Sequence, residues 1–159
     1  SLWALAKLSE CSPTTDLFDH IRLEDIADLF QKSLKLKNLK PQHISNSLCA
    51  LAKLSEYSPT RDLFAKIGLE DIADLFQQLL KLKNIKPQDI SNSLWALAKL
   101  SEYSGTTDLF TYIRLEAIAD LFQQLLKPEN LKNSKPQEIS SSLWALAKLS
   151  ECSPTTDLF

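Results

Sequence analysis

Glycine is almost absent from this chain of 159 residues, in which Gly68 and Gly105 are the only two. Seven prolines, by contrast, interrupt a composition rich in leucine, alanine, lysine and serine. Such a composition is typical of helices with sharp ends, and it excludes a disordered or an all-β chain. We therefore expect an all-α protein.

Cysteine and histidine are too few and too scattered to indicate a metal site. Cys11, Cys49 and Cys152 show no Cys-x-x-Cys or Cys/His spacing, and aromatic residues take their places in other copies of a repeated motif. His20 and His43 have no counterparts in those copies, and no nucleophile elbow or glycine-rich phosphate loop is present. We interpret the cysteines as space-filling side chains, and we expect no enzyme, no cofactor and no metal.

Long apolar runs are missing as well. No stretch approaches the roughly 18 apolar residues of a membrane-spanning helix, and no signal-peptide pattern is present. Together with the unpaired cysteines, this predicts a reducing, cytoplasmic compartment without a membrane partner. That compartment is a bacterial cytoplasm or, for a bacterial effector, the cytosol of a host, with an organelle as the alternative.

The chain also lacks an excess of positive charge. Lysine and arginine total 18 against 20 acidic residues, so that the net charge is −2. Nucleic-acid-binding domains are usually basic. The overall charge therefore does not indicate such a domain, although a local basic stripe is compatible with this total.

What the sequence does contain is a repeat. The segment "SLWALAKLSECSPTTDLF" occurs at 1–18 and, letter for letter, at 142–159, with near-copies that begin at Ser47 and Ser93. The spacings are therefore 46, 46 and 49 residues, and periods of this length indicate stacked repeats. The extra residues fall in a connection. We divide the chain into a partial repeat at 1–40, repeats at 41–86 and 87–135, and a partial repeat at 136–159.

Each repeat is predicted to contain two main helices. Helix A begins at a proline, which is favoured at the first helical position. Helix B is expected over about 23–37, where apolar residues recur at helical spacing. The intervening "TTDLFDHI" is predicted as a short extra helix, with a single kinked helix as the alternative. Helix A is expected over 41–56, 87–102 and 136–151.

The connections from helix B to helix A are short, so the two must run antiparallel. Antiparallel pairs repeated in register predict an α-solenoid, a right-handed superhelix with a short extra helix in each repeat of about 46 residues. Because the repeats at both ends of the sequence are partial, we expect end-to-end self-association in concentrated solution.

Helix A carries a further set of residues, here called the ladder, that core packing does not require. An amide or hydroxyl, then a tryptophan or cysteine, then a lysine recur at i, i+3 and i+7, on one helix face. These groups can read a base edge, stack a base and hold a phosphate. A variable residue just inside helix A is a candidate for specificity. The candidate RNA-binding residues are Lys7, His43, Asn46, Lys53, Asp89, Asn92, Trp95, Lys99, Glu138, Ser141, Trp144 and Lys148, with Trp3 and Cys49 completing the ladder.

Each of these residues also has a purely structural interpretation. For the tryptophans, packing against helix B of an adjacent unit is favoured over contact with a ligand, and their replacement by Cys49 fits that role. The lysines fit an ordinary solvated face. The residues His43, Asp89 and Glu138 vary as exposed positions do.

The run "PQDISNSLWALAKL" at 87–100, with its counterpart at 136–149, resembles the octotricopeptide repeat family. Repeats of that family have a similar proline-led helix that ends in a "LWALAKL"-like run. The resemblance covers all four copies of helix A, and its style is closest to the repeats of intracellular bacteria. It implies an α-solenoid that binds RNA through the surface of helix A.

Residues and resemblance together favour a non-catalytic, modular solenoid that binds single-stranded RNA along the ladder. The alternative is a protein–protein interaction scaffold in the manner of armadillo or HEAT arrays. In that case the chain is a module, such as part of a bacterial effector, that engages a protein partner.

Overall fold

The computed structural model describes residues 4, 22–36, 38–57, 67–103, 110 and 112–152. Within these residues the protein is all-helical, without a strand. The short helix predicted at "TTDLFDHI" lies outside the described residues, as do Trp3 and Lys7. The helices are α3 (Leu23–Leu34), α4 (Pro41–Tyr57), α6 (Leu69–Leu80), α7 (Pro87–Tyr103), α9 (Leu115–Leu125), α10 (Pro128–Asn133) and α11 (Pro136–Cys152).

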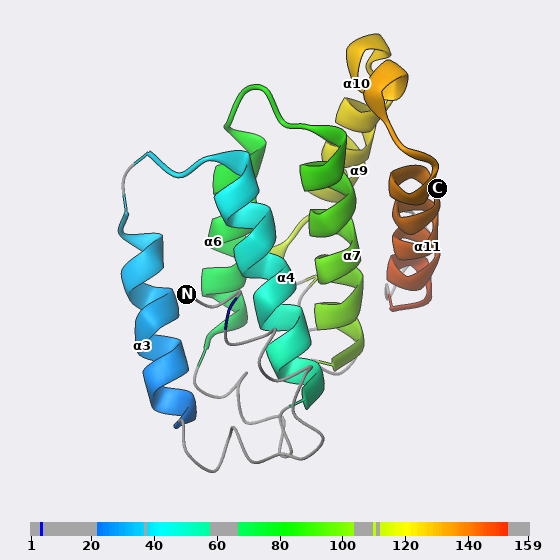
Figure 1. The fold of residues 1–159 in the computed structure, drawn as a ribbon. Helices are drawn as coiled ribbons and strands as arrows, with labels where there is room; N and C mark the ends of the chain where they lie inside the picture. Colours follow the sequence, from blue (N-terminus) through cyan, green and yellow to red (C-terminus); the bar gives the residue numbers. More distant parts are fainter. Residues whose placement is uncertain are drawn as a thin grey trace.

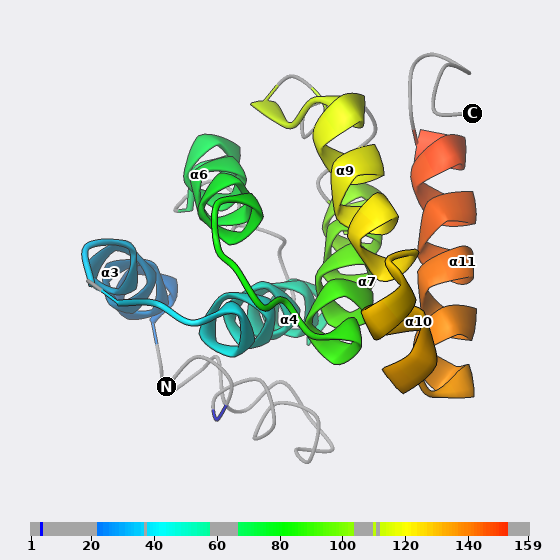
Figure 2. The ribbon, with the colours of Figure 1, turned by 90° about the horizontal axis from the view of Figure 1, so that it is seen from above.

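The helices lie in two rows. Helices α4, α7 and α11, which are the predicted copies of helix A, pack side by side in one row, and α3, α6 and α9 form the other (Figure 2). The α3–α4 connection, the α6–α7 connection and α10 all lie at the same edge of the molecule, at the top of Figure 1. Segments that are far apart in the sequence therefore share one edge.

The predicted copies of helix A are confirmed, and each is one residue longer than expected. Each begins at its proline. Proline has no backbone N–H, but this costs no hydrogen bond, because an N–H in the first turn of a helix has no partner within the helix. The backbone N–H of the residue before that proline is bonded instead by a side chain three residues further on, as described below.

Helix B is shorter than predicted, because α3 ends at Leu34 and not near residue 37. The chain turns there through Asn38, whose φ of 65° lies in the left-handed region that asparagine tolerates better than most residues. Asn84 has the same conformation, with a φ of 62°, after α6. The repeated asparagine therefore turns the chain, after the helix has ended, toward the proline that begins the next helix.

The insertion in the third repeat forms a helix of its own, α10, where the sequence predicted only a longer connection. Pro128 stands in its first turn, Glu129 follows near its positive end, and Lys132 lies in its last turn. The Asn130 side chain donates a hydrogen bond to the carbonyl of Gln124, at 2.7 Å, and so holds α10 against the end of α9.

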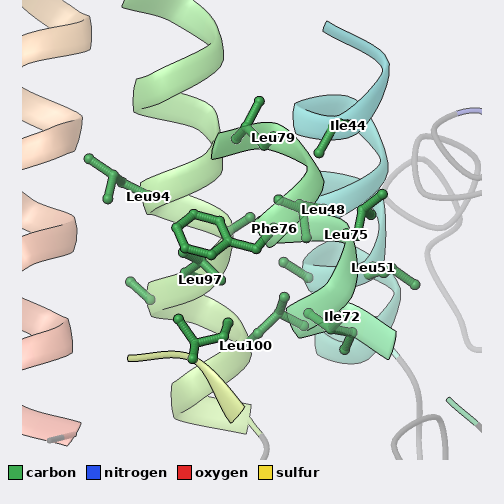
Figure 3. Packing of buried hydrophobic residues seen from close by; sticks show 14 of the residues in the cluster. Ile44, Leu48, Leu51, Ile72, Leu75, Phe76, Leu79, Leu94, Leu97 and Leu100 are labelled. Atoms are coloured by element: carbon green, nitrogen blue, oxygen red, sulfur yellow. The ribbon is translucent and has the colours of Figure 1, made fainter. Parts of the chain in front are cut away.

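The core lies between the two rows. Phe76 of α6 is fully buried, and its ring lies among leucines of the facing helices, Leu48 of α4 and Leu97 of α7 (Figure 3). Burial of one such side chain contributes about 1.5–3 kcal/mol. Because Phe76 belongs to the same buried cluster as Leu48 and Leu97, which lie on two successive copies of helix A, its burial helps to join one repeat to the next.

Candidate nucleic-acid interface

The middle helix of the row, α7, is open to solvent along a single line of residues. Between Pro87 and Glu102, every residue outside this line is buried. Helices α4 and α11 flank α7, and α9 packs against it from the second row. The residues left accessible are Gln88, Asn92, Trp95, Lys99 and Glu102. The predicted ladder positions of this repeat are thus the part of α7 that a ligand can reach.

The same positions on the neighbouring helices are also accessible. Asn46, Cys49 and Lys53 on α4 are half-buried, as are Ser141 and Lys148 on α11. Trp144 is 37% exposed. The structure therefore brings three units of the ladder together on one face of the row, and neither Trp95 nor Trp144 is fully buried.

Lysines lie beside the tryptophan rings and link one unit to the next. Nζ of Lys99 is 6.0 Å from the centroid of the Trp95 ring and 5.2 Å from that of Trp144 on the adjacent helix. Nζ of Lys148 is 6.0 Å from the Trp144 ring. Each contact of this kind contributes about 0.5–1 kcal/mol at an exposed site. Across α7 and α11 the ladder is therefore an alternating series of rings and cations.

The ladder lysines also have acidic neighbours. Nζ of Lys99 lies 3.9 Å from a carboxylate oxygen of Glu102, and Nζ of Lys148 lies 3.4 Å from one of Glu151. Exposed pairs of this kind contribute about 0.2–1 kcal/mol. Stacking of a nucleic-acid base on an aromatic side chain contributes about 1–3 kcal/mol, so a base can displace a lysine from a ring at a net gain.

Cys49 occupies the place of a tryptophan and fills it differently. Its thiol donates a hydrogen bond to the carbonyl of Asn92 on α7, at 3.2 Å. Burial raises the pKa of the Cys49 thiol to about 12, although nearby Lys53 lowers it in part. The thiol is therefore neutral at physiological pH, and neutral thiols are poor nucleophiles and metal ligands.

The variable residues just inside helix A serve as caps. Each accepts a hydrogen bond from the backbone N–H three residues earlier: Nδ1 of His43 from Lys40 at 3.3 Å, a carboxylate oxygen of Asp89 from Lys86 at 3.3 Å, and one of Glu138 from Lys135 at 2.8 Å. This is the second half of a capping box. The three different side chains therefore share a hydrogen-bond acceptor at the same place. Their contact with RNA stays a prediction.

A second feature of the surface was not predicted from the sequence, and we call it the basic edge. Segments 35–40, 81–86 and 127–135 hold nine of the chain's 18 basic residues and a single acid, Glu129, so they carry +8 while the rest carries −10. The described residues of these segments lie at the edge at the top of Figure 1. The described lysines of the basic edge are all exposed: Lys35, Lys40, Lys81, Lys83, Lys86, Lys127, Lys132 and Lys135.

The lysines of the basic edge differ from those of the ladder in their surroundings. Across the described residues, no ion pair within 4.0 Å includes any of the eight. Between the α6–α7 connection and α10 the surface is hollowed into a recess of about 840 Å³, which is lined by five of them. Gln88, the first accessible residue of α7, lines the same recess. The basic edge and the ladder are therefore continuous.

A signal for the basic edge is present in the sequence. The connections "KLKNLKP" and "KLKNIKP" repeat three lysines without an acid, and "KPENLKNSKP" holds three more. The net charge of −2 conceals them, because acidic residues elsewhere outnumber the remaining basic ones. Only the repeat topology brings the three segments together.

No protein-family model, curated protein or solved structure matches this chain. Among the described residues, no three His, Cys, Asp or Glu side chains gather closely enough to hold a metal ion. The helices that the structure describes are too short or too polar to span a bilayer.

Proposed function

We propose that this chain is a non-catalytic, modular protein that binds single-stranded RNA, with the phosphates along the basic edge and the bases over the ladder. The two rows of helices then belong to an α-solenoid, wound as a right-handed superhelix in the manner of octotricopeptide-like repeats. The observation that carries the proposal is the basic edge, where eight exposed lysines have no acidic neighbour within ion-pair distance among the described residues.

The arrangement suits a single strand better than a duplex. Packed helices lie about 8–10 Å apart, so successive connections present lysines at regular intervals along the row. A strand that follows them can turn its bases toward the ladder, where Trp144 is partly exposed. Bases of a duplex are stacked on one another and cannot reach such a ring.

Salt-dependent binding tests the proposal. In the Lys83→Gln, Lys86→Gln double variant, affinity for labelled single-stranded RNA should fall, because two phosphate contacts are lost. For a single strand the slope of log K against log salt changes by about 0.7 for each lost contact, or about 1.4 here. Fluorescence anisotropy at several salt concentrations measures both quantities.

The matched control is Arg22→Gln with Arg114→Gln. It removes two exposed cations at the starts of α3 and α9, away from the basic edge. The control should keep the affinity and slope of the unsubstituted chain. Equal losses in both double variants would show that total charge, and not the basic edge, governs binding, and would contradict the proposal.

A protein-interaction scaffold is the second candidate, and the ladder itself favours it. Its lysines alternate with Glu102 and Glu151, so this face is nearly neutral, and exposed tryptophan is enriched at protein interfaces. In this case the unsubstituted chain retains no RNA at low salt. Trp144→Ala then weakens capture of a protein partner. The same variant has no effect in the RNA assay, because the unsubstituted chain does not bind RNA.

A further inference from the structure

The recess of about 840 Å³ at the basic edge is formed by three parts of the chain that are separate in the sequence. Its lining residues come from the α6–α7 connection, from the end of α9, and from α10 with the residues that join it to α11. Sites for small molecules measure about 300–1,000 Å³. The recess is therefore large enough to hold a compact ligand, and not only one phosphate of a passing strand.

The charged side chains that line the recess are mostly cations. Two are carboxylates, Glu129 and Glu138, and one oxygen of Glu138 already accepts the backbone N–H of Lys135 at 2.8 Å. Across the described residues, neither glutamate lies within 4.0 Å of a lysine nitrogen of the recess. Five lysines against two glutamates leave an excess of three positive charges. The lysines are Lys81, Lys83, Lys86, Lys127 and Lys135.

The backbone restricts the places from which three of these lysines extend. Lys86, Lys127 and Lys135 each precede a proline that begins a helix. The residue before a proline is confined to extended backbone, and the ψ of Lys127 is 140°. The cations are therefore held near the recess before any ligand binds.

The wall formed by α10 is fixed by its own hydrogen bonds. The Asn133 side chain donates to the carbonyl of Glu129 at 2.8 Å, and the Ser134 hydroxyl donates to the carbonyl of Asn130 at 2.6 Å. The Asn130 side chain in turn bonds to the end of α9, through the carbonyl of Gln124. The shape of the recess therefore does not depend on a ligand.

We propose that the recess is a binding site for a compact oligophosphate, which means a short chain of linked phosphates that is either free or part of a nucleotide. A cleft lined by charges of one sign concentrates the electric field and attracts ions of the opposite sign. Lysine binds phosphate as a point charge with three donors. Linked phosphates contact lysines of both walls at once, whereas a single phosphate contacts those of one wall.

This site is independent of RNA binding. The proposed RNA strand uses the whole basic edge and the ladder, whereas an oligophosphate needs only the recess. Lys40 separates the two, because it lies on the basic edge and precedes Pro41 as Lys135 precedes Pro136, but it does not line the recess. Lys132 is a second such residue, exposed on α10 and outside the lining.

Calorimetric titration with inorganic triphosphate at low ionic strength tests the proposal. One triphosphate should bind per chain, and orthophosphate should bind about tenfold more weakly or less, because it reaches fewer lysines. Titration with adenosine triphosphate, without magnesium, distinguishes the two sources of the ligand. An affinity equal to that of inorganic triphosphate assigns the site to phosphate chains in general, and a tighter one assigns it to nucleotides.

Single variants locate the binding. Lys127→Gln and Lys135→Gln should each weaken the binding of triphosphate by about tenfold, the loss of one charge-assisted contact. The controls Lys132→Gln and Lys40→Gln remove the same charge outside the recess and should leave the affinity unchanged. All four lysines are exposed, and circular dichroism verifies that each variant is helical.

Three results would overturn the proposal: no binding of triphosphate, equal binding of orthophosphate, or equal losses in the recess variants and the controls. Binding of several triphosphates per chain would also contradict it, since the lysines would then act one by one. A chain that binds triphosphate but no RNA contradicts only the proposed function. A chain that binds RNA but no triphosphate contradicts only the oligophosphate site.

Discussion

At the scale of single residues, the most variable position of helix A has the most uniform role. Each of the three residues, His43, Asp89 and Glu138, accepts a hydrogen bond from the backbone N–H of the residue before the proline that begins its own helix. Asp89 is only 6% exposed, and it also accepts a hydrogen bond from Ser45 on the neighbouring helix. Variation of the side chain is therefore compatible with a fixed function of its acceptor atom.

This role leads to a stability prediction for Asp89. Asp89→Ala should lower the free energy of unfolding by about 1–2 kcal/mol, because two donors lose their acceptor. Asp89→Glu should change it far less, since Glu138 caps α11 in the same way. Urea denaturation measures both. Asp74→Ala, an exposed aspartate of α6, is the control, and a loss there as large as that of Asp89→Ala would argue against a capping effect.

At the scale of helices, the sequence predicted the copies of helix A closely because proline marks their first residue. Helix B was predicted too long, because an apolar period does not mark the residue at which a helix ends, and α3 stops at Leu34, before the left-handed Asn38. Helix α10 was missed because its six residues are too few to show a period. The structure places Gly68 at the N-cap of α6.

Gly68 also gives a way to strengthen one helix. It precedes α6 with a φ of −67° and without a side-chain cap, and an added Cβ would meet its nearest neighbour at an ordinary 3.7 Å. Gly68→Ser should raise the free energy of unfolding by about 0.5–1 kcal/mol, because serine caps a helix and restricts the unfolded chain.

Thermal denaturation measures this change. Arg114→Ser, at the N-cap of α9, is the comparison because it adds a cap without removing a glycine. Its gain should be smaller than that of Gly68→Ser. A decrease in stability for Gly68→Ser would mean that a side chain is not tolerated at this N-cap.

At the scale of the whole molecule, sequence reasoning located the ladder but not the basic edge. Asn92, Trp95 and Lys99 lie close together in the sequence, so helical spacing alone places them on one face. Lys35, Lys81 and Lys127 are each separated by more than forty residues, and they share an edge only because the connections of successive repeats align. The basic edge depends on how the repeats stack, so neither the spacing of residues within one helix nor the net charge of the chain predicts it.

The three segments that meet at one edge carry +8 by sequence, although the net charge of the whole chain is only −2. A charged chromatography matrix contacts one side of a protein at a time, so this chain should adsorb to a cation exchanger at pH 7 despite its net charge of −2. Lys83→Gln with Lys86→Gln should elute at lower salt than Arg22→Gln with Arg114→Gln, although the two variants have the same net charge. Elution of both variants at the same salt concentration would mean that adsorption depends only on the net charge of the chain. A nearly neutral protein is therefore expected to bind an anionic surface as a cation does, provided that the surface meets the basic edge.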